Sequence, residues 1–292
     1  MNTRFLLLKL KLCAGIGIKS EYRFYEWMID RYKTIPKSIN ISAEEIAEIL
    51  MLNKNNSKTF INSYNSDKLN SVLNHHINHV KWFTILDDIY PEALKEAYMP
   101  PIVLFYFGDL ELLKTKNLAI VGARNNTEYS VSVIKALMPD IVNNQITVIS
   151  GLAKGVDRLA HLAAISCGGR TIAVIGTGLD KYYPKENEDL QRTIAKRDLL
   201  ISEYPVGVTP AKHHFPERNR IIAGLASSIL VTEAKYRSGS LITANLALQN
   251  NRNILSVPGR IDSDLSVGCN ELISAGAKPV LTSKDILEEY YY

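Results

Sequence analysis

The sequence predicts an α/β protein: a Rossmann-like, doubly wound, mostly parallel sheet with a small helical domain before it. Three observations lead to this prediction. From residue 118 onwards, short β-branched segments alternate with helix-like segments. These short segments are apolar almost throughout, which is typical of strands that helices cover on both faces. Before residue 80, apolar residues recur instead at helical spacing.

The composition is that of a soluble globular protein, with 46% hydrophobic and 22% charged residues among 292, which excludes disordered and fibrous classes. Residues 1–80 hold 11 basic and 7 acidic residues, whereas residues 81–292 hold 23 of each. The net charge of +4 therefore indicates an acidic partner only weakly, and any binding face has to come from local clustering.

A cytoplasmic protein without a membrane partner is expected. The three cysteines are far apart and form no CxxC pair, which is typical of a reducing compartment. No stretch reaches the ~18 consecutive apolar residues of a membrane span. The leucine-rich start is interrupted by Lys9 and Lys11, so a packed amphipathic segment is favoured over a signal peptide.

Residues 1–80 are predicted to form the small helical domain. The segment ISAEEIAEILMLN (41–53) spaces its apolar residues as one helix face, and Ser42 with Glu45 predicts a capping box. Residues 53–78 are rich in Asn, Ser and Lys, which suits short helices or poorly packed connections.

Residues 81–117 are predicted to be an extended connector with one strand. Prolines disfavour a long helix there, and the apolar run IVLFYFG (102–108) supplies the strand.

Residues 118–292 are predicted to form the extended Rossmann-like domain. The expected strands are LAIVGAR (118–124), TVISG (147–151), TIAVIGTG (171–178), LLISEYP (199–205), SILVTEA (228–234), NILSVPG (253–259) and KPVLT (278–282). The expected helices include VSVIKALMPDIV (131–142), GVDRLAHLAAI (155–165), NRIIAGLASS (219–228) and SLITANLALQN (240–250).

Glycine recurs where these strands end. In doubly wound sheets, ligands bind outside the carboxyl ends of the strands, and glycine lets the backbone approach a ligand closely. Helix N-termini at the same edge offer free N–H groups to a phosphate. An anion-binding crevice is therefore predicted from the following set: Gly122, Gly151, Gly176, Gly178, Ser238-Gly239-Ser240 and Gly259.

A nucleotide cofactor is not expected. The turn GARNNT (122–127) lacks the GxGxxG pattern, and no acidic residue ends the next strand to hold a ribose. The turn GTGLDK (176–181) lacks the third glycine, and no GxxxxGK[ST] segment is present. These absences disfavour NAD and ATP.

Basic residues follow several of the strands. Each alone is more often a solvated surface charge, but together they favour a chain of phosphates over one small phosphate. Tyr182 and Tyr183 could stack on unpaired bases, although core packing explains one of them equally well. The basic residues concerned are Arg124, Lys154, Lys185, Arg218, Arg220, Lys235 and Arg237.

Catalytic and metal-binding patterns are sparse. Asp157 and His161 lie four apart on one helix face, and Asp157 is better explained as the helix N-cap. Glu203 and Glu233 end strands, but no GxSxG nucleophile motif accompanies them. The cluster His75-His76-x-x-His79 lies in an Asn-rich stretch and is favoured as a solvated cluster over a metal site. No catalytic residue and no metal are therefore assigned.

The strand-end and helix segments of residues 118–292 resemble those of the DNA-processing protein A (DprA, also called Smf) family. The resemblance is collinear over about residues 85–285, and three segments are specific: SGLAKGVD, FPERNRIIAGL and SGSLITA. It implies a single-stranded DNA-binding protein of natural transformation that protects incoming strands and helps load the RecA recombinase onto them. It also implies an extended Rossmann fold and a homodimer.

The resemblance assigns DNA-binding roles to individual residues. Arg218, Asn219 and Arg220 match the family's Arg-Asn-Arg motif. Gly122 with Arg124 matches its Gly-(Ser/Ala)-Arg turn, Lys185 matches its Tyr-Pro-Lys segment, and Ser238, Gly239 and Ser240 match its Ser-Gly-Ser turn, with Lys154 and Lys235 as further contacts. LCAGIGIKSEYRFYEWM (12–28) is similar to a helix-hairpin-helix hairpin of the family's SAM-like domain, although a plain helix–helix turn fits as well.

Two other functions stay open at this point. Nucleotide phosphoribohydrolases share this Rossmann variant but use a PGGxGT turn, whereas the candidate turn here reads PGRIDSD (258–264). A scaffold with a vestigial crevice is disfavoured by the basic residues at the crevice. For the dimer, KPVLT and the preceding GCNELISAGA (268–277) could form a sheet edge that pairs with its copy.

Overall fold

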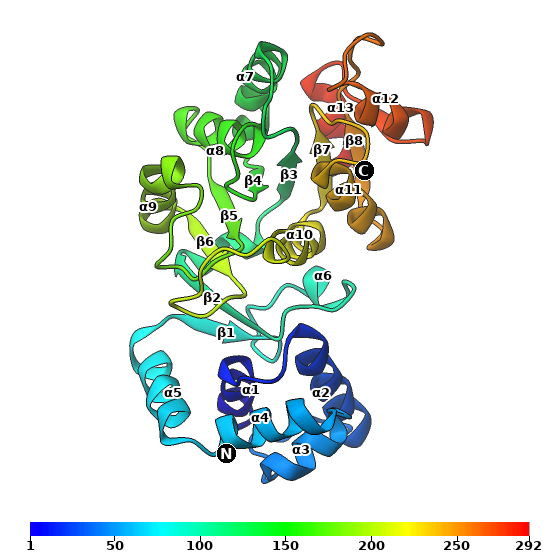
Figure 1. The fold of residues 1–292 in the computed structure, drawn as a ribbon. Helices are drawn as coiled ribbons and strands as arrows, with labels where there is room; N and C mark the ends of the chain where they lie inside the picture. The colour runs from blue at the N-terminus through cyan, green and yellow to red at the C-terminus, as the bar shows by residue number, and fades with distance from the viewer. Residues whose placement is uncertain (292) are drawn as a thin grey trace. The chain divides into compact units, whose positions relative to one another are not determined.

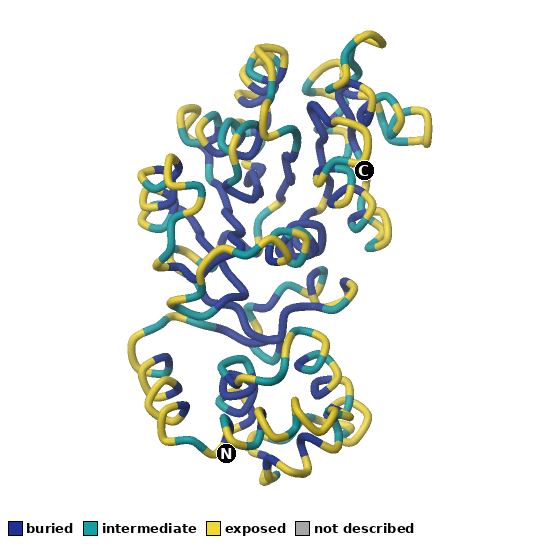
Figure 2. The backbone as a smooth tube through the Cα atoms, in the orientation of Figure 1, coloured by how far each residue is buried: buried dark blue, intermediate teal, exposed yellow. Residues whose placement is uncertain are grey.

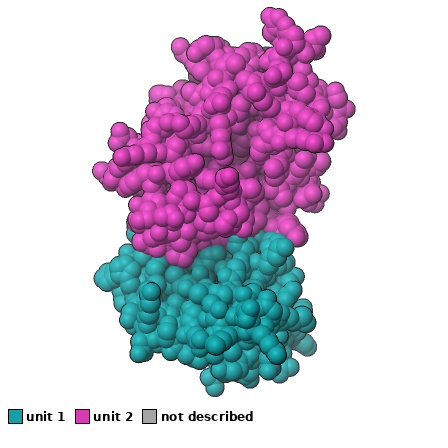
Figure 3. Space-filling model, in the orientation of Figure 1, with its two compact units in different colours: residues 1–90, 99–106 teal, residues 91–98, 107–292 magenta. Residues whose placement is uncertain are grey.

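The computed structural model describes residues 1–291. They divide into two compact units, which Figure 3 colours separately: residues 1–90 with 99–106, and residues 91–98 with 107–292. The first unit is mainly helical, and the second contains a parallel sheet with helices on both faces.

The helical unit is built from amphipathic helices around Leu6, Phe24, Met28, Ile46 and Phe60, all fully buried. The predicted capping box is confirmed, because Ser42 Oγ accepts from the Glu45 amide at 3.1 Å and the Glu45 carboxylate accepts from the Ser42 amide at 2.7 Å. The helices are α1 (Thr3–Leu12), α2 (Ile18–Arg31), α3 (Ala43–Ile49), α4 (Lys54–Tyr64) and α5 (Asp67–His79).

The turn between α1 and α2 requires glycine for a packing reason. Gly15 has φ +87°, and a Cβ there would lie 2.9 Å from both the Asn56 carbonyl oxygen and the Phe60 amide nitrogen. The turn therefore lies directly against the backbone of α4, which explains this glycine without any ligand.

Two strands lie in residues 81–117, where the sequence predicts one. In the helical unit, β1 (Trp82–Thr84) pairs antiparallel with β2 (Val103–Gly108), with Trp82 opposite Phe105. A three-residue strand is too short to show the alternation by which a strand is recognised from sequence. The same segment also contains α6 (Glu92–Lys95) and a 3₁₀ turn (Leu110–Lys114).

The second unit confirms the Rossmann-like, doubly wound prediction (Figure 1). Within it, the described residues form seven parallel strands in the order β6-β5-β4-β3-β7-β8-β9. The chain runs outward from β3 in one direction and then returns to run from β7 in the other. The strands are β3 (Asn117–Val121), β4 (Thr147–Ser150), β5 (Thr171–Ile175), β6 (Leu199–Ser202), β7 (Ser228–Val231), β8 (Asn253–Ser256) and β9 (Lys278–Pro279).

Alternate residues of each strand face different helix layers. Leu118, Ile120 and Leu230 pack with α7 (Glu128–Asn143) and α8 (Val156–Ser166) in one buried cluster. On the other face, α10 (His214–Leu225) contacts β5, and α11 (Gly239–Gln249) contacts β7 and β8. Figure 2 shows the central strands buried between helices whose outer sides are exposed. The remaining helices are α9 (Glu188–Arg197), α12 (Val267–Ser274) and α13 (Ser283–Leu287).

Candidate functional site

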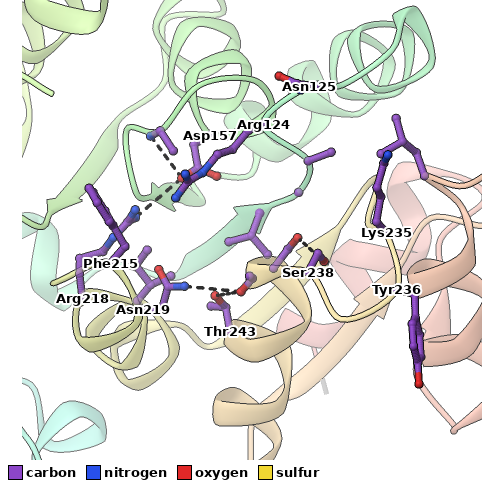
Figure 4. A pocket seen from close by; sticks show the side chains of 18 residues that line it. Arg124, Asn125, Asp157, Phe215, Arg218, Asn219, Lys235, Tyr236, Ser238 and Thr243 are labelled. Atoms are coloured by element: carbon purple, nitrogen blue, oxygen red, sulfur yellow. Dashed lines mark hydrogen bonds and ion pairs between the residues drawn. The ribbon is translucent and has the colours of Figure 1, made fainter. Parts of the chain in front are cut away.

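A cavity of about 500 Å³ opens at the carboxyl ends of β3 and β7. These two strands are neighbours at the point where the strand order reverses, which is where doubly wound sheets bind ligands. Five segments line the cavity: the loop after β3, the start of α8, one side of α10, the loop from β7 into α11, and Leu265 in the loop after β8 (Figure 4).

Eight of the eleven residues to which the family resemblance assigns DNA-binding roles meet in this cavity. Because they come from separate loops of the sheet edge, only the fold brings them together. Those that line it are Gly122, Arg124, Arg218, Asn219, Lys235, Ser238, Gly239 and Ser240.

The opening of the cavity is cationic. Arg124 and Lys235 are both exposed, and the Arg124 guanidinium lies 5.5 Å from the centre of the Phe215 ring, as in a cation–π contact. The Arg124 turn requires glycine, because a Cβ on Gly122 would lie 2.6 Å from Val156 Cγ2 and 3.0 Å from the Glu233 carbonyl oxygen. The loop is thereby held close to α8.

The N-terminus of α11 adds backbone donors to the same opening. Ser238 is the N-cap residue of this 11-residue helix, and its side chain makes no capping hydrogen bond. The first-turn N–H groups of a helix lack intrahelical partners and attract anions. Asn219 lies beside this turn, where its amide donates to the Gly239 carbonyl at 3.5 Å. A phosphate at the opening would therefore meet two cationic side chains and a helix N-terminus.

The floor of the cavity is different, because it holds a buried ion pair. Arg218 and Asp157 have side chains only 5% and 10% exposed, and Arg218 Nη1 lies 3.7 Å from Asp157 Oδ2. The guanidinium occupies the space beside Gly151, where a Cβ would lie 1.0 Å from Nη1. Burial raises the pKa of the Asp157 carboxyl, and the neighbouring Arg218 opposes that rise.

The expectation that Asp157 is the N-cap of its helix is wrong. Gly155 is the N-cap of α8, with φ +74°, and Asp157 lies within the first turn. A Cβ on Gly155 would lie 2.3 Å from the Ala123 carbonyl oxygen, so the close approach of the two loops selects glycine there. The Asp157 carboxylate lines the cavity, and it accepts hydrogen bonds from the Ser150 side chain and from the Gly151 and Ala153 amides.

His161, one turn further along α8, is fully buried and has a structural role. Its Nδ1 lies 2.6 Å from Thr171 Oγ1, and burial together with the charge of Arg218 lowers the pKa of its imidazole to about 3. The ring is therefore neutral at physiological pH. Glu233 is likewise structural, because its carboxylate accepts hydrogen bonds from the Thr127 amide at 2.8 Å and from Ser130 Oγ at 2.7 Å.

A second, smaller cavity of about 60 Å³ lies beside the first and shares Arg124, Phe215 and Arg218 with it. Lys154 and Tyr183 also line it, and the Tyr183 ring lies 5.3 Å from that of Phe215. Lys154 forms an exposed ion pair with Glu186 at 2.7 Å.

Six of the predicted residues line neither cavity, namely Gly178, Tyr182, Lys185, Arg220, Arg237 and Gly259. Lys185 is exposed in the turn before α9. The Arg192 guanidinium lies over the Tyr182 ring, with its Cζ atom 4.5 Å from the centre of that ring. Arg220 is buried, and one of its nitrogens lies 2.6 Å from each carboxylate oxygen of Glu203.

Sequence reasoning did not assign Asp157 or Phe215 to the site. Phe215 lies three residues before Arg218 in the segment HHFPERNR (213–220). Because residues three apart share a helix face, this spacing could have placed Phe215 in the site beside Arg218. For Asp157 no local signal was available, because its partner comes from a different helix, 61 residues later.

The fold and the cavity define a doubly wound α/β protein with a cationic binding crevice at the point where the strand order reverses. The chain belongs to the DNA recombination-mediator protein A family, whose model matches residues 81–291. The family resemblance predicted from the motifs is thereby confirmed.

Two characterised relatives illustrate the family. The chain is 48% identical to DNA processing protein DprA of Streptococcus pneumoniae over 210 residues, which cover 72% of this chain and 74% of that protein. It is 44% identical to DNA processing protein DprA of Bacillus subtilis over 201 residues, 68% of each chain.

Solved structures of family members have the same fold as this chain. The X-ray structure of DprA from Streptococcus pneumoniae superposes with a TM-score of 0.88 at 39% identity and covers 97% of both chains. A structure of DNA processing protein A from Helicobacter pylori, described by its single-stranded DNA binding mode, superposes with a TM-score of 0.64 at 30% identity, covering 72% of this chain and 95% of that one.

No helix in residues 1–291 is long and apolar enough to cross a membrane. No cluster of three or more His, Cys, Asp or Glu side chains in the same range is arranged to hold a metal ion.

Proposed function

We propose that the protein binds single-stranded DNA in the cavity at the carboxyl ends of β3 and β7, called the switch-point cavity below. The strand is held there chiefly by its phosphates. The observation that carries the proposal is the convergence of Arg124, Lys235 and the α11 N-terminus at one opening. The single-stranded DNA binding mode described for the Helicobacter pylori relative supports it. In this proposal Lys154, Lys185, Tyr182 and Tyr183 lie along the path of the strand beyond the cavity.

Binding measured by fluorescence anisotropy over a salt series tests the proposal. Counterion release makes log affinity fall linearly with log salt, by about 0.7 for each neutralised phosphate of a single strand. We expect a slope that corresponds to several phosphates. An affinity independent of salt would contradict phosphate-dominated binding, and no binding at low salt would contradict the function itself.

We propose further that the protein acts in the cytoplasm during natural transformation, where it protects incoming strands and loads the RecA recombinase. The family description as a recombination mediator supports this role. We expect the protein to increase the rate at which RecA forms filaments on single strands. An unchanged rate at saturating protein would count against a loading role.

The protein is proposed to bind DNA and not to be an enzyme. The turn at Pro258 lacks the Gly-Gly and Gly-Thr pairs of the phosphoribohydrolase turn, and the Glu233 carboxylate is hydrogen-bonded by Thr127 and Ser130. We expect no release of free base from nucleoside monophosphates, measured by chromatography over hours. Steady, enzyme-dependent release would favour the phosphoribohydrolase function instead.

We also propose a homodimer that uses the β9 end of the sheet. This strand is the last in the order, and Leu281 beside it is 75% exposed. Size-exclusion chromatography with light scattering is expected to give twice the chain mass at micromolar concentration. The monomer mass at that concentration would refute the dimer.

A further inference from the structure

Three of the six histidines of the chain lie close to the C-terminus of α5, in the segment HHINH (75–79). The sequence favours a solvated cluster there, because no cysteine or acidic residue accompanies the histidines. The structure divides the three rings into two groups. His76 is buried, whereas His75 and His79 are exposed, and Figure 2 shows exposed residues all along α5. Only the two exposed rings are accessible to an ion from solvent.

His76 has a structural role. Its Nδ1 donates to the Val72 carbonyl oxygen at 2.9 Å, and its ring packs edge-on against that of Phe105 in β2, with ring centres 5.6 Å apart. Burial lowers the pKa of this imidazole, so the ring is neutral at physiological pH. His76 therefore holds the end of α5 against β2 and is not available as a ligand.

The two exposed rings have the separation of two ligands of one metal ion. His75 and His79 lie one helical turn apart on the same face of α5, and their ring centres are 5.1 Å apart. An ion bound by one nitrogen of each imidazole lies about 2.0–2.1 Å from both nitrogens, which at a tetrahedral angle places the two ring centres about 5 Å apart. Zinc-binding helices of the H-E-x-x-H type present two histidines at this same spacing.

The surroundings of the pair also favour a cation. Among residues 1–291, the contacts found for the His75 and His79 side chains are with each other and with the ring of His76, so their nitrogens are not used in hydrogen bonds or ion pairs with the protein. The helix α5 ends at His79, and the last turn of a helix carries carbonyl groups that lack intrahelical partners and attract positive charge.

The donor set restricts the ion. Residues 74–80 contain no Asp, Glu or Cys, so imidazole nitrogens are the only side-chain ligands of this kind in the segment. Imidazole suits Zn²⁺, Ni²⁺ and Cu²⁺, whereas Mg²⁺ and Ca²⁺ require oxygen ligands. We propose that His75 and His79 bind one divalent transition-metal ion of this class, with water in its remaining coordination positions. Neither histidine lines the switch-point cavity, so this inference is independent of the proposed DNA binding.

Calorimetric titration of the whole protein with Zn²⁺ tests the site. We expect one ion per chain at this site. His75→Ala and His79→Ala are each expected to weaken its binding at least about tenfold, because even the loss of an outer-shell partner costs a metal site about 10–100-fold in affinity. His213→Ala removes an exposed histidine outside α5 and is the matched control, with an expected affinity equal to that of the wild-type protein.

Cu²⁺ bound to the wild-type protein provides a second readout. Its electron paramagnetic resonance spectrum should show hyperfine splitting from two nitrogens, and from one in either α5 variant. This measurement also decides the question if a variant does not fold, because a wild-type spectrum without two coordinating nitrogens would overturn the site. Three calorimetric results would overturn it as well: no binding up to millimolar Zn²⁺, an unchanged affinity in His75→Ala, or an equal loss in His213→Ala.

Discussion

Arg124→Glu is expected to reduce the affinity for single-stranded DNA about 100-fold or more. The side chain is exposed at the cavity opening, where its guanidinium lies over the Phe215 ring. A hydrogen bond to a charged group contributes about 1.5–3 kcal/mol, and charge reversal replaces that attraction with repulsion of the same phosphate. Tenfold in affinity corresponds to 1.4 kcal/mol, so the combined change reaches at least about two factors of ten.

Anisotropy with labelled oligonucleotide measures the effect, and circular dichroism checks that the variant is folded. Lys135→Glu makes a similar charge change at an exposed position of α7 and is the control for net charge. An Arg124→Glu protein that binds like Lys135→Glu would remove Arg124 from the site. Arg124→Ala should also lower the slope against log salt by about 0.7, because one phosphate contact is lost.

Arg220→Met is expected to lower the free energy of unfolding by about 3–5 kcal/mol. The guanidinium and the Glu203 carboxylate are 9% and 1% exposed, with a shortest contact of 2.6 Å. Removal of the arginine takes away the charge that compensates the buried Glu203 carboxylate, which is the costly way to break a buried pair. Because Arg220 lines neither cavity, we expect the substitution to affect DNA binding only through the stability of the fold.

Urea denaturation measures this effect, with two comparisons. Arg192→Met breaks the exposed pair with Glu188 and should cost at most about 1 kcal/mol. Glu203→Leu combined with Arg220→Met removes both charges and should recover most of the lost stability. A single Arg220→Met variant as stable as Arg192→Met would show that the buried pair does not stabilise the fold.

Arg220 also illustrates what a sequence motif does not show, namely where each of its side chains lies in the fold. The Arg-Asn-Arg motif groups Arg218 with Arg220, but a helix turns by about 100° per residue, so residues two apart point in very different directions. On α10 this rotation places Arg218 at the cavity floor and Arg220 against Glu203 at the end of β6. Whether either arginine faces DNA depends on which surface of α10 packs on the sheet.

Other features were accessible from sequence because their signals are local. Apolar runs that end in glycine marked the strands, and Ser42 with Glu45 marked the start of α3. Strand ends were predicted a few residues too late, since the residues after Val121, Ser150 and Ile175 already belong to the loops that line the cavities. The short β1 carried too few residues to be recognised.

The α/β class, the family, and the basic and glycine residues at the strand ends were all predictable from the amino-acid sequence. These follow from periodicity and from short contiguous motifs, which need no knowledge of what lies nearby in space. The fold was needed to show that Arg218 pairs with Asp157, that Gly155 and not Asp157 is the N-cap of α8, and that Arg220 pairs with Glu203. Each of these features depends on a contact between different segments, such as that of Gly155 with the loop after β3, and local sequence does not encode such contacts.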